Sequence, residues 1–198
     1  MRNTKEVEKA EARFQNHVAS VVLRTDGFLI INWRDKSGSG NYYVRYYLDI
    51  KRGCFIVSGD LGGSVAMWYN AVTPEDLYRY INSVGYFLEK IQCSTDKYVY
   101  DVDDILSDLR EYKTELIRDL EIEDTDEIDS DFEVLEDYFT EHGKTELMIY
   151  SDDILEIFEK YASEWWESPF ESAGQRISER VYLWIAGYRM ACRQLNII

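Results

Sequence analysis

The segment FLIINWRDKSGSGNYYVRYYLDIKRGCFIVSGDLGGSVAMWY, residues 28–69, decides the fold of the first half of the chain. Its runs 28–33, 42–50, 54–58 and 64–69 are rich in β-branched and aromatic residues, and glycine-containing turns separate them. Glycine suits such turns because it adopts positive φ without steric cost. The pattern predicts about four antiparallel strands connected as a meander.

Helices are predicted on both sides of this meander. Residues 4–20 carry apolar side chains at spacings of three and four, which is typical of a helix that lies on a surface. After the last strand, Thr73 and Pro74 supply an N-cap and a first-turn proline, and apolar residues then repeat at helical spacing as far as Ile91. The first half is therefore predicted to be a sheet with flanking helices.

The second half has a helical period throughout. Segment 121–131 is acidic without a strong apolar period and is predicted to be a linker or mobile loop. The fold class is α+β, with an N-terminal antiparallel sheet domain in residues 1–100 and an acidic all-helical region in residues 101–198 that can pack with it as one unit. Helices are expected over about 101–120, 132–143, 151–165 and 175–195.

The charge of the chain is unevenly distributed. In 198 residues there are 22 Lys and Arg against 38 Asp and Glu, a formal net charge of −16. Residues 1–100 carry 13 basic and 11 acidic residues, whereas residues 101–171 carry five basic and 26 acidic residues. Because cations supply most of the attraction to nucleic acid and to anionic membranes, direct binding to either is not expected. A basic protein is the expected partner, and homodimerisation is left open.

Carboxylates form a stripe along the first acidic helix, where their steps of three and four place them on one face. Steps of that size measure roughly 4.5 to 6 Å at about 1.5 Å rise per residue, close to the separation of phosphates along a nucleic-acid strand. The third acidic helix repeats the arrangement more weakly. The residues predicted to contact a partner are Asp104, Asp108, Glu111, Glu115 and Asp119 on the first helix, and Asp152, Glu156 and Glu159 on the third.

Aromatic side chains and arginines near these acids extend the prediction. Exposed tyrosines and tryptophans can contact a partner's arginines through cation–π interactions. The C-terminal arginines are expected to pair with the acidic helices of the same chain. The aromatic residues are Tyr112, Tyr138, Tyr150, Trp165 and Trp166, and the arginines are Arg176, Arg180, Arg189 and Arg193.

In size, charge and acidic helices over residues 101–171, the chain resembles the small acidic inhibitors that phages and mobile elements encode. These include nucleic-acid mimics and anti-CRISPR proteins that block Cas nucleases. The resemblance matches no diagnostic motif and transfers no functional residue. It implies a non-enzymatic protein that blocks the basic nucleic-acid channel of a partner, a Cas nuclease being the concrete case, in the cytoplasm of a host cell.

Two other interpretations stay open. In the first, the acids are merely the solvated faces of amphipathic helices. In the second, the chain is a scaffold or regulatory module that binds through its sheet, with Tyr43, Tyr47 and Trp68 on the functional surface and the acidic half serving solubility or dimerisation.

Catalytic, metal and cofactor sites are not predicted. The three cysteines, Cys54, Cys93 and Cys192, lie far apart and in no paired spacing, which indicates reduced thiols in a reducing compartment. The two histidines, His17 and His142, are also distant from each other, which disfavours a metal site or a catalytic triad. No apolar run approaches the roughly 20 residues of a membrane-spanning helix, and the expected location is the cytoplasm.

Overall fold

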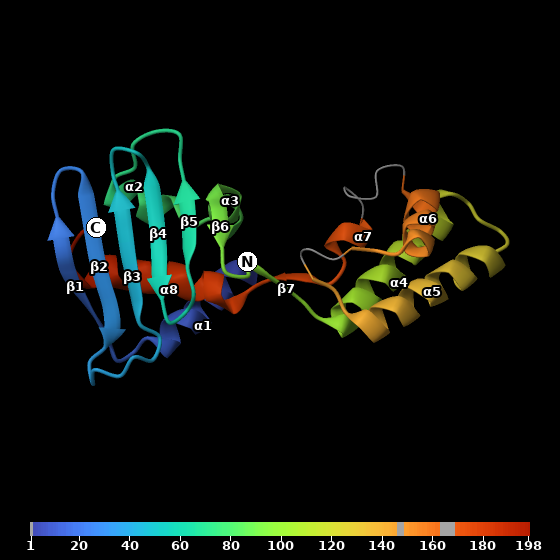
Figure 1. The fold of residues 1–198 in the computed structure, drawn as a ribbon, viewed down its shortest axis with the longest axis horizontal. Helices are drawn as coiled ribbons and strands as arrows, with labels where there is room; N and C mark the ends of the chain where they lie inside the picture. Colours follow the sequence, from blue (N-terminus) through green and yellow to red (C-terminus); the bar gives the residue numbers. More distant parts are fainter. Residues whose placement is uncertain (1, 146–148, 163–168) are drawn as a thin grey trace. The chain divides into compact units, whose positions relative to one another are not determined.

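The computed structural model describes residues 2–145, 149–162 and 169–198, and the chain divides into two compact units. The sheet unit comprises Met1–Lys97 and Ser178–Ile198, and the helical unit comprises Tyr98–Ile177. The predicted α+β class is confirmed (Figure 1). We predicted one boundary, at residue 100. The structure has two, because the chain returns after residue 177 to complete the sheet unit.

The sheet unit contains a six-stranded antiparallel sheet in the order β1-β2-β3-β4-β5-β6, two strands more than the four that we predicted. Each strand pairs with the strand before it and the strand after it along the chain. The predicted meander is therefore present as β2 to β5, and β1 and β6 extend it at its two ends. The elements of the sheet unit are α1 (Arg2–Arg13), β1 (His17–Arg24), β2 (Phe28–Asp35), β3 (Val44–Asp49), β4 (Cys54–Gly59), β5 (Ser64–Met67), α2 (Pro74–Tyr80), α3 (Val84–Lys90), β6 (Ile91–Ser94) and α8 (Glu179–Gln194).

The two additional strands lie where apolar residues continue at helical spacing. Helix α1 ends at Arg13, and two successive turns follow, in which Phe14 N donates to Glu11 O and His17 N donates to Phe14 O. The valine-rich segment after these turns then pairs with β2. The helix predicted to run to Ile91 is divided by a second N-cap, where Ser83 Oγ accepts a hydrogen bond from Tyr86 N, and Ile91 begins β6.

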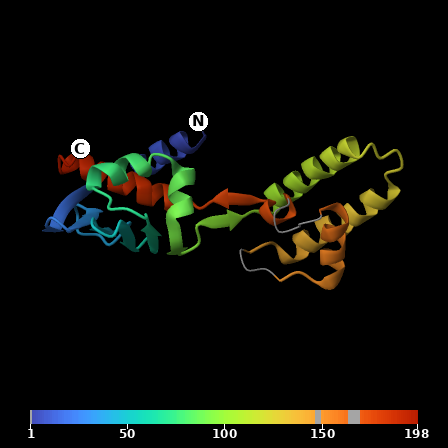
Figure 2. The same ribbon diagram turned by 90° about the horizontal axis from the view of Figure 1, so that it is seen from above.

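The helices α1, α2 and α8 lie on one face of the sheet (Figure 2). Strand alternation points Leu29, Ile31 and Trp33 into this layer, and all three are buried. Helix α8 is buried along most of its length. Its Trp184 is hydrogen-bonded twice, since the Trp184 carbonyl accepts from Tyr46 Oη and the indole nitrogen donates to Leu61 O. The last helix is therefore central to the packing of the sheet unit.

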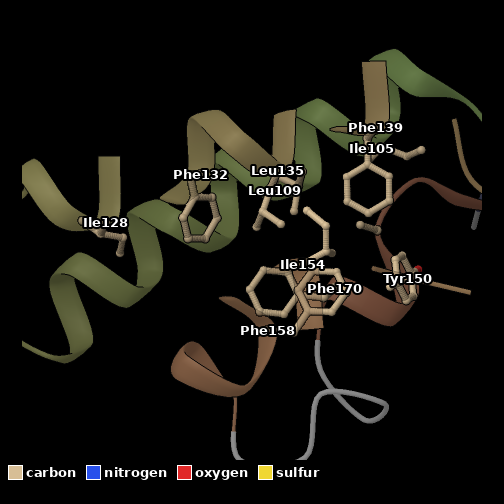
Figure 3. Packing of buried hydrophobic residues seen from close by; sticks show 11 residues of the cluster. Ile105, Leu109, Ile128, Phe132, Leu135, Phe139, Tyr150, Ile154, Phe158 and Phe170 are labelled. Carbon is tan, nitrogen blue, oxygen red and sulfur yellow. The ribbon is translucent and has the colours of Figure 1, made fainter. Parts of the chain in front are cut away.

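The helical unit has its own apolar core (Figure 3). Helices α4 and α5 pack against each other, α6 and α7 complete the core, and the short strands β7 and β8 pair where the chain enters and leaves the unit. The elements are β7 (Tyr98–Tyr100), α4 (Val102–Asp119), α5 (Asp126–His142), α6 (Asp152–Tyr161), α7 (Pro169–Ser172) and β8 (Gln175–Ile177).

Three boundaries in this part of the chain differ from our predictions. The predicted linker 121–131 is shorter, because α5 already begins at Asp126. The helix predicted over 151–165 is α6, which ends at Tyr161 and is followed by an extended Ala162, while residues 163–165 lie outside the described residues. The predicted last helix begins at Glu179, and residues 175–177 form β8.

Among the described residues, none of the helices combines the length and the apolar character needed to cross a membrane.

Candidate acidic interface on the helical unit

The negative charge is concentrated in the helical unit. Residues 98–177 contain 26 acidic and six basic residues, a net charge of −20, whereas the rest of the chain has a net charge of +4. Among the described residues of the unit, five of the six bases form ion pairs with seven acids; three of the 26 acids, Glu146, Glu164 and Glu167, lie outside these residues. These pairs are Arg110 with Glu136, Lys113 with Asp129, Arg118 with Asp119, Lys160 with Glu127 and Asp131, and Arg176 with Asp104 and Asp108.

Asp104 and Asp108, two of the predicted contact residues, hold the unit together. Arg176 Nε lies 3.0 Å from Asp104 Oδ2, and Arg176 Nη1 lies 3.3 Å from Asp108 Oδ2. Asp108 Oδ2 also accepts a hydrogen bond of 2.8 Å from Gly174 N. These contacts attach β8 to α4, so both carboxylates serve the fold. The expectation that Arg176 pairs with an acidic helix is confirmed, although Arg176 lies on β8 and not on the last helix.

Glu111 and Glu115 are the members of the α4 stripe that are both exposed and unpaired among the described residues. Neither carboxylate has an ion pair among the described residues, and both line a hollow of about 180 Å³ with Asp108, Tyr112 and residues of α7. Asp119, at the end of the helix, is exposed and pairs with Arg118. The predicted stripe of five therefore separates into two structural carboxylates, two exposed and unpaired ones, and one that is locally neutralised.

The predicted residues of α6 form a separate group. Asp152, Glu156 and Glu159 are exposed, whereas Ile154 and Phe158 of the same helix point into the core. None of the three acids forms an ion pair among the described residues, and none lines the hollow beside Glu111 and Glu115. The predicted acids of α6 are therefore separate from that hollow.

The aromatic residues predicted beside the acids are less exposed than we expected. Tyr150 is buried in the core, and Tyr112 is half-buried and donates its hydroxyl to Tyr161 O at 3.1 Å. Tyr138 is half-buried and stacks on His142, with ring centroids 4.6 Å apart. Trp165 and Trp166 lie outside the described residues. The described tyrosines therefore contribute mainly to packing.

The arginines of α8 serve the sheet unit. Arg193 Nη2 lies 2.8 Å from Glu11 Oε1 of α1, and Arg189 Nε lies 3.9 Å from the same oxygen. For these two arginines, the predicted pairing with the acidic helices is wrong. Helix α8 packs in the other unit, against α1, and its carboxylate partner comes from there.

Lys144 is the buried base of the helical unit, and no role was predicted for it from the sequence. Its side chain is buried, and Nζ donates hydrogen bonds to Phe170 O at 2.7 Å and Glu171 O at 2.5 Å. The ammonium group lies 5.3 Å from the centroid of the Tyr100 ring. Burial lowers the pKa of Lys144 to about 8, while Glu171 and Asp108 act in the opposite direction. No sequence pattern distinguishes this lysine from an exposed one.

From the lowered pKa of Lys144 we predict that the stability of the helical unit rises with pH. Its folded-state pKa of about 8 lies below the value of 10.5 expected for the unfolded chain, so between these values the unfolded state binds more protons. The free energy of unfolding of the helical unit should therefore increase from about pH 8 to about pH 10, above which the raised pKa of Tyr112 acts oppositely. Urea unfolding of the protein and of Lys144→Met at several pH values measures this. The same slope in both proteins would rule out Lys144 as its source.

No group of three or more His, Cys, Asp or Glu side chains in residues 2–145, 149–162 and 169–198 is placed to hold a metal ion. His17 is buried between Phe14 and Trp33, and this burial lowers its pKa.

Comparison with known proteins found no matching family model, no matching curated protein and no matching solved structure.

Proposed function

We propose that this protein is a non-enzymatic binding protein whose helical unit occupies the basic nucleic-acid-binding channel of a partner. The concrete form of the proposal is a phage-encoded inhibitor of a Cas nuclease. The observation that supports it is the charge balance of the helical unit. Five of its six bases are already paired internally and the sixth, Lys144, is buried, yet only seven of the 23 acids among its described residues have a basic partner.

Such an excess of carboxylates suits a basic channel for two reasons. A field of one sign increases the rate of association with an oppositely charged protein. Carboxylates held on a helix also match phosphates in spacing, since Glu111 and Glu115 are separated by four residues, about 6 Å along the axis. The apolar core behind α4 and α6 fixes the helix backbones that carry these side chains, which reduces the backbone entropy lost on binding.

The residues proposed to contact the partner are the members of the predicted set that are exposed and have no ion pair among the described residues, which leaves out Asp119 because it pairs with Arg118. On α4 these are Glu111 and Glu115, and on α6 they are Asp152, Glu156 and Glu159. Arginine and lysine of the partner would donate charge-assisted hydrogen bonds to them. Asp104 and Asp108 are left out of the contact set because they already hold Arg176.

Charge reversal at the two exposed positions of α4 tests the proposal. We expect the variant with Glu111→Lys and Glu115→Lys to lose at least about tenfold in affinity for its partner at about 0.1 M salt, because it replaces attraction by repulsion. The matched control carries Glu8→Lys and Glu89→Lys, which change the net charge equally at exposed, unpaired positions of the sheet unit. Both variants should keep the far-ultraviolet circular dichroism spectrum of the parent protein.

Affinity capture from nuclease-treated bacterial lysate, with the captured proteins identified by mass spectrometry, supplies the first readout. Guide-loaded Cas nucleases are the first purified proteins to titrate. The proposal is supported if a basic nucleic-acid-binding protein is captured at about 0.1 M salt, is lost at about 0.5 M, and is lost with the α4 variant but not with the control. Capture that both variants retain at either salt concentration would exclude the α4 carboxylates as the interface.

A further inference from the structure

The sheet has an uncovered face opposite α1, α2 and α8 (Figure 2). No described helix of residues 2–97 or 178–198 lies on it. Side chains alternate along each strand, so the neighbours of the buried Leu29 and Ile31 point to this open face. The strand registers align one apolar or weakly polar residue from each of the six strands across it. This open-face row consists of Leu23, Ile30, Tyr47, Ile56, Val65 and Cys93.

The open-face row borders an apolar hollow. A depression of about 420 Å³ is lined by Ile30, Tyr47 and Ile56 of the row, and by Phe28 and Met67 of the adjacent register position. Phe28 and Met67 are 48% and 44% exposed. Isolated exposed apolar residues are ordinary on protein surfaces, but a contiguous set that lines a hollow is typical of a binding surface.

Three arginines of this part of the sheet unit have weak acidic partners or none among the described residues, and one of them, Arg52, lines the hollow together with Asp49. Arg34 and Arg45 lie on the open face and have no carboxylate within ion-pair distance among the described residues, and Arg52 is only 3.9 Å from Asp49. The Arg45 side chain is held in place because Nε donates a hydrogen bond of 2.6 Å to Asn32 Oδ1. In a chain of net charge −16, the open face is thus a cationic surface with an apolar centre.

We propose that the open face binds an acidic amphipathic helix of a partner protein, with apolar side chains in the hollow and carboxylates on Arg34, Arg45 and Arg52. Charge complementarity selects this occupant. A helix that presents apolar residues at spacings of three and four, flanked by glutamates, matches both the central row and the three arginines. This second interface is independent of the acidic one, because it lies on the other unit and attracts the opposite charge.

Two other occupants fit the surface less well. Single-stranded nucleic acid needs a track of aromatic rings on which successive bases can stack, whereas the two rings that line the hollow, Phe28 and Tyr47, share it with the aliphatic side chains of the row and with Met67. A second copy bound face to face would bring two sets of arginines into one interface, and like charges in contact are unfavourable.

Fluorescence anisotropy with a labelled synthetic peptide tests the inference on the full chain. The probe is an 18-residue helix with a leucine stripe flanked by glutamates, and its control is a scrambled peptide of the same composition, which carries the same charge. At about 0.15 M salt we expect the amphipathic probe to bind at least about tenfold more tightly than the scrambled one. The NMR signal of the Met67 methyl group should shift when the amphipathic probe is added and should not shift when the scrambled peptide is added.

Matched variants locate the binding. We expect Arg34→Glu with Arg52→Glu to abolish the preference for the amphipathic probe, whereas Lys5→Glu with Arg180→Glu, exposed positions outside the open face, should leave it unchanged. A thermal melt checks that all variants are folded. Three outcomes would overturn the inference: equal binding of both peptides, binding of a single-stranded oligonucleotide that depends on Arg34 and Arg52, or a dimer in light scattering that excludes the probe.

Discussion

Phe158→Ala is expected to lower the free energy of unfolding of the helical unit by about 3–5 kcal/mol, because it removes an aromatic ring from the centre of a small core. Phe158 is fully buried and stacks on Phe170 with ring centroids 4.5 Å apart (Figure 3). Its ring also meets Tyr150 edge-on at 5.0 Å. Self-repulsion in a unit of net charge −20 also opposes its compact state, so the loss acts on a unit that already carries an unfavourable electrostatic term.

Amide hydrogen exchange measures this effect in each unit separately. We expect α4, α5 and α6 to lose protection together in Phe158→Ala, while the strands of the sheet unit keep theirs. Leu155→Ala is the matched control, because Leu155 lies on the same helix and is only partly buried. Equal loss of protection in both units would show that the two units do not unfold independently.

Gly187→Ala is expected to destabilise the sheet unit, although alanine is the better helix former. A Cβ atom at Gly187 would lie 2.2 Å from Tyr46 Oη and 3.1 Å from Trp33 Cδ1. Both rings are fully buried, so they can yield only by disturbing the side chains packed around them. The resulting overpacking costs about 1–3 kcal/mol, more than the gain of up to about 1 kcal/mol in helix propensity. It also displaces the Tyr46 hydroxyl from Trp184 O.

Gly85→Ala is the matched control for this prediction. Gly85 lies in α3, and a Cβ atom there would meet no other atom within 4 Å. The substitution should stabilise the protein by about 0.5–1 kcal/mol through helix propensity alone. Thermal unfolding followed by circular dichroism compares the two variants. A stabilising effect of Gly187→Ala would contradict the close packing of α8 on Tyr46 and Trp33.

Local patterns in the sequence predicted much of the fold. The strands of the meander and helices α4 to α6 follow from periodicity and turn residues, because these signals act over a few residues. Strand β1 was missed because Phe14, His17 and Val18 continue the helical spacing of α1 beyond its end. The place of α8 in the sheet unit depends on contacts with strands more than a hundred residues away, which periodicity does not record.

The acidic surface was predictable in composition but not in the roles of its members. Spacing correctly placed Asp108, Glu111 and Glu115 on one side of α4, where they line a common hollow. It could not show that Asp104 and Asp108 are engaged, because Arg176 is 68 residues from Asp108 in the chain. Lys144 was missed for a similar reason, since its burial depends on α7.

Competition with nucleic acid tests the central claim most directly. A fluorescently labelled DNA duplex is bound to the captured partner, or to a guide-loaded Cas nuclease that binds this protein, and is then titrated with this protein at about 0.1 M salt. The account predicts that the DNA is displaced competitively, that Glu111→Lys with Glu115→Lys displaces it at least about tenfold less effectively, and that Glu8→Lys with Glu89→Lys behaves as the parent. A ternary complex, in which the partner holds the DNA and this protein together, would contradict it.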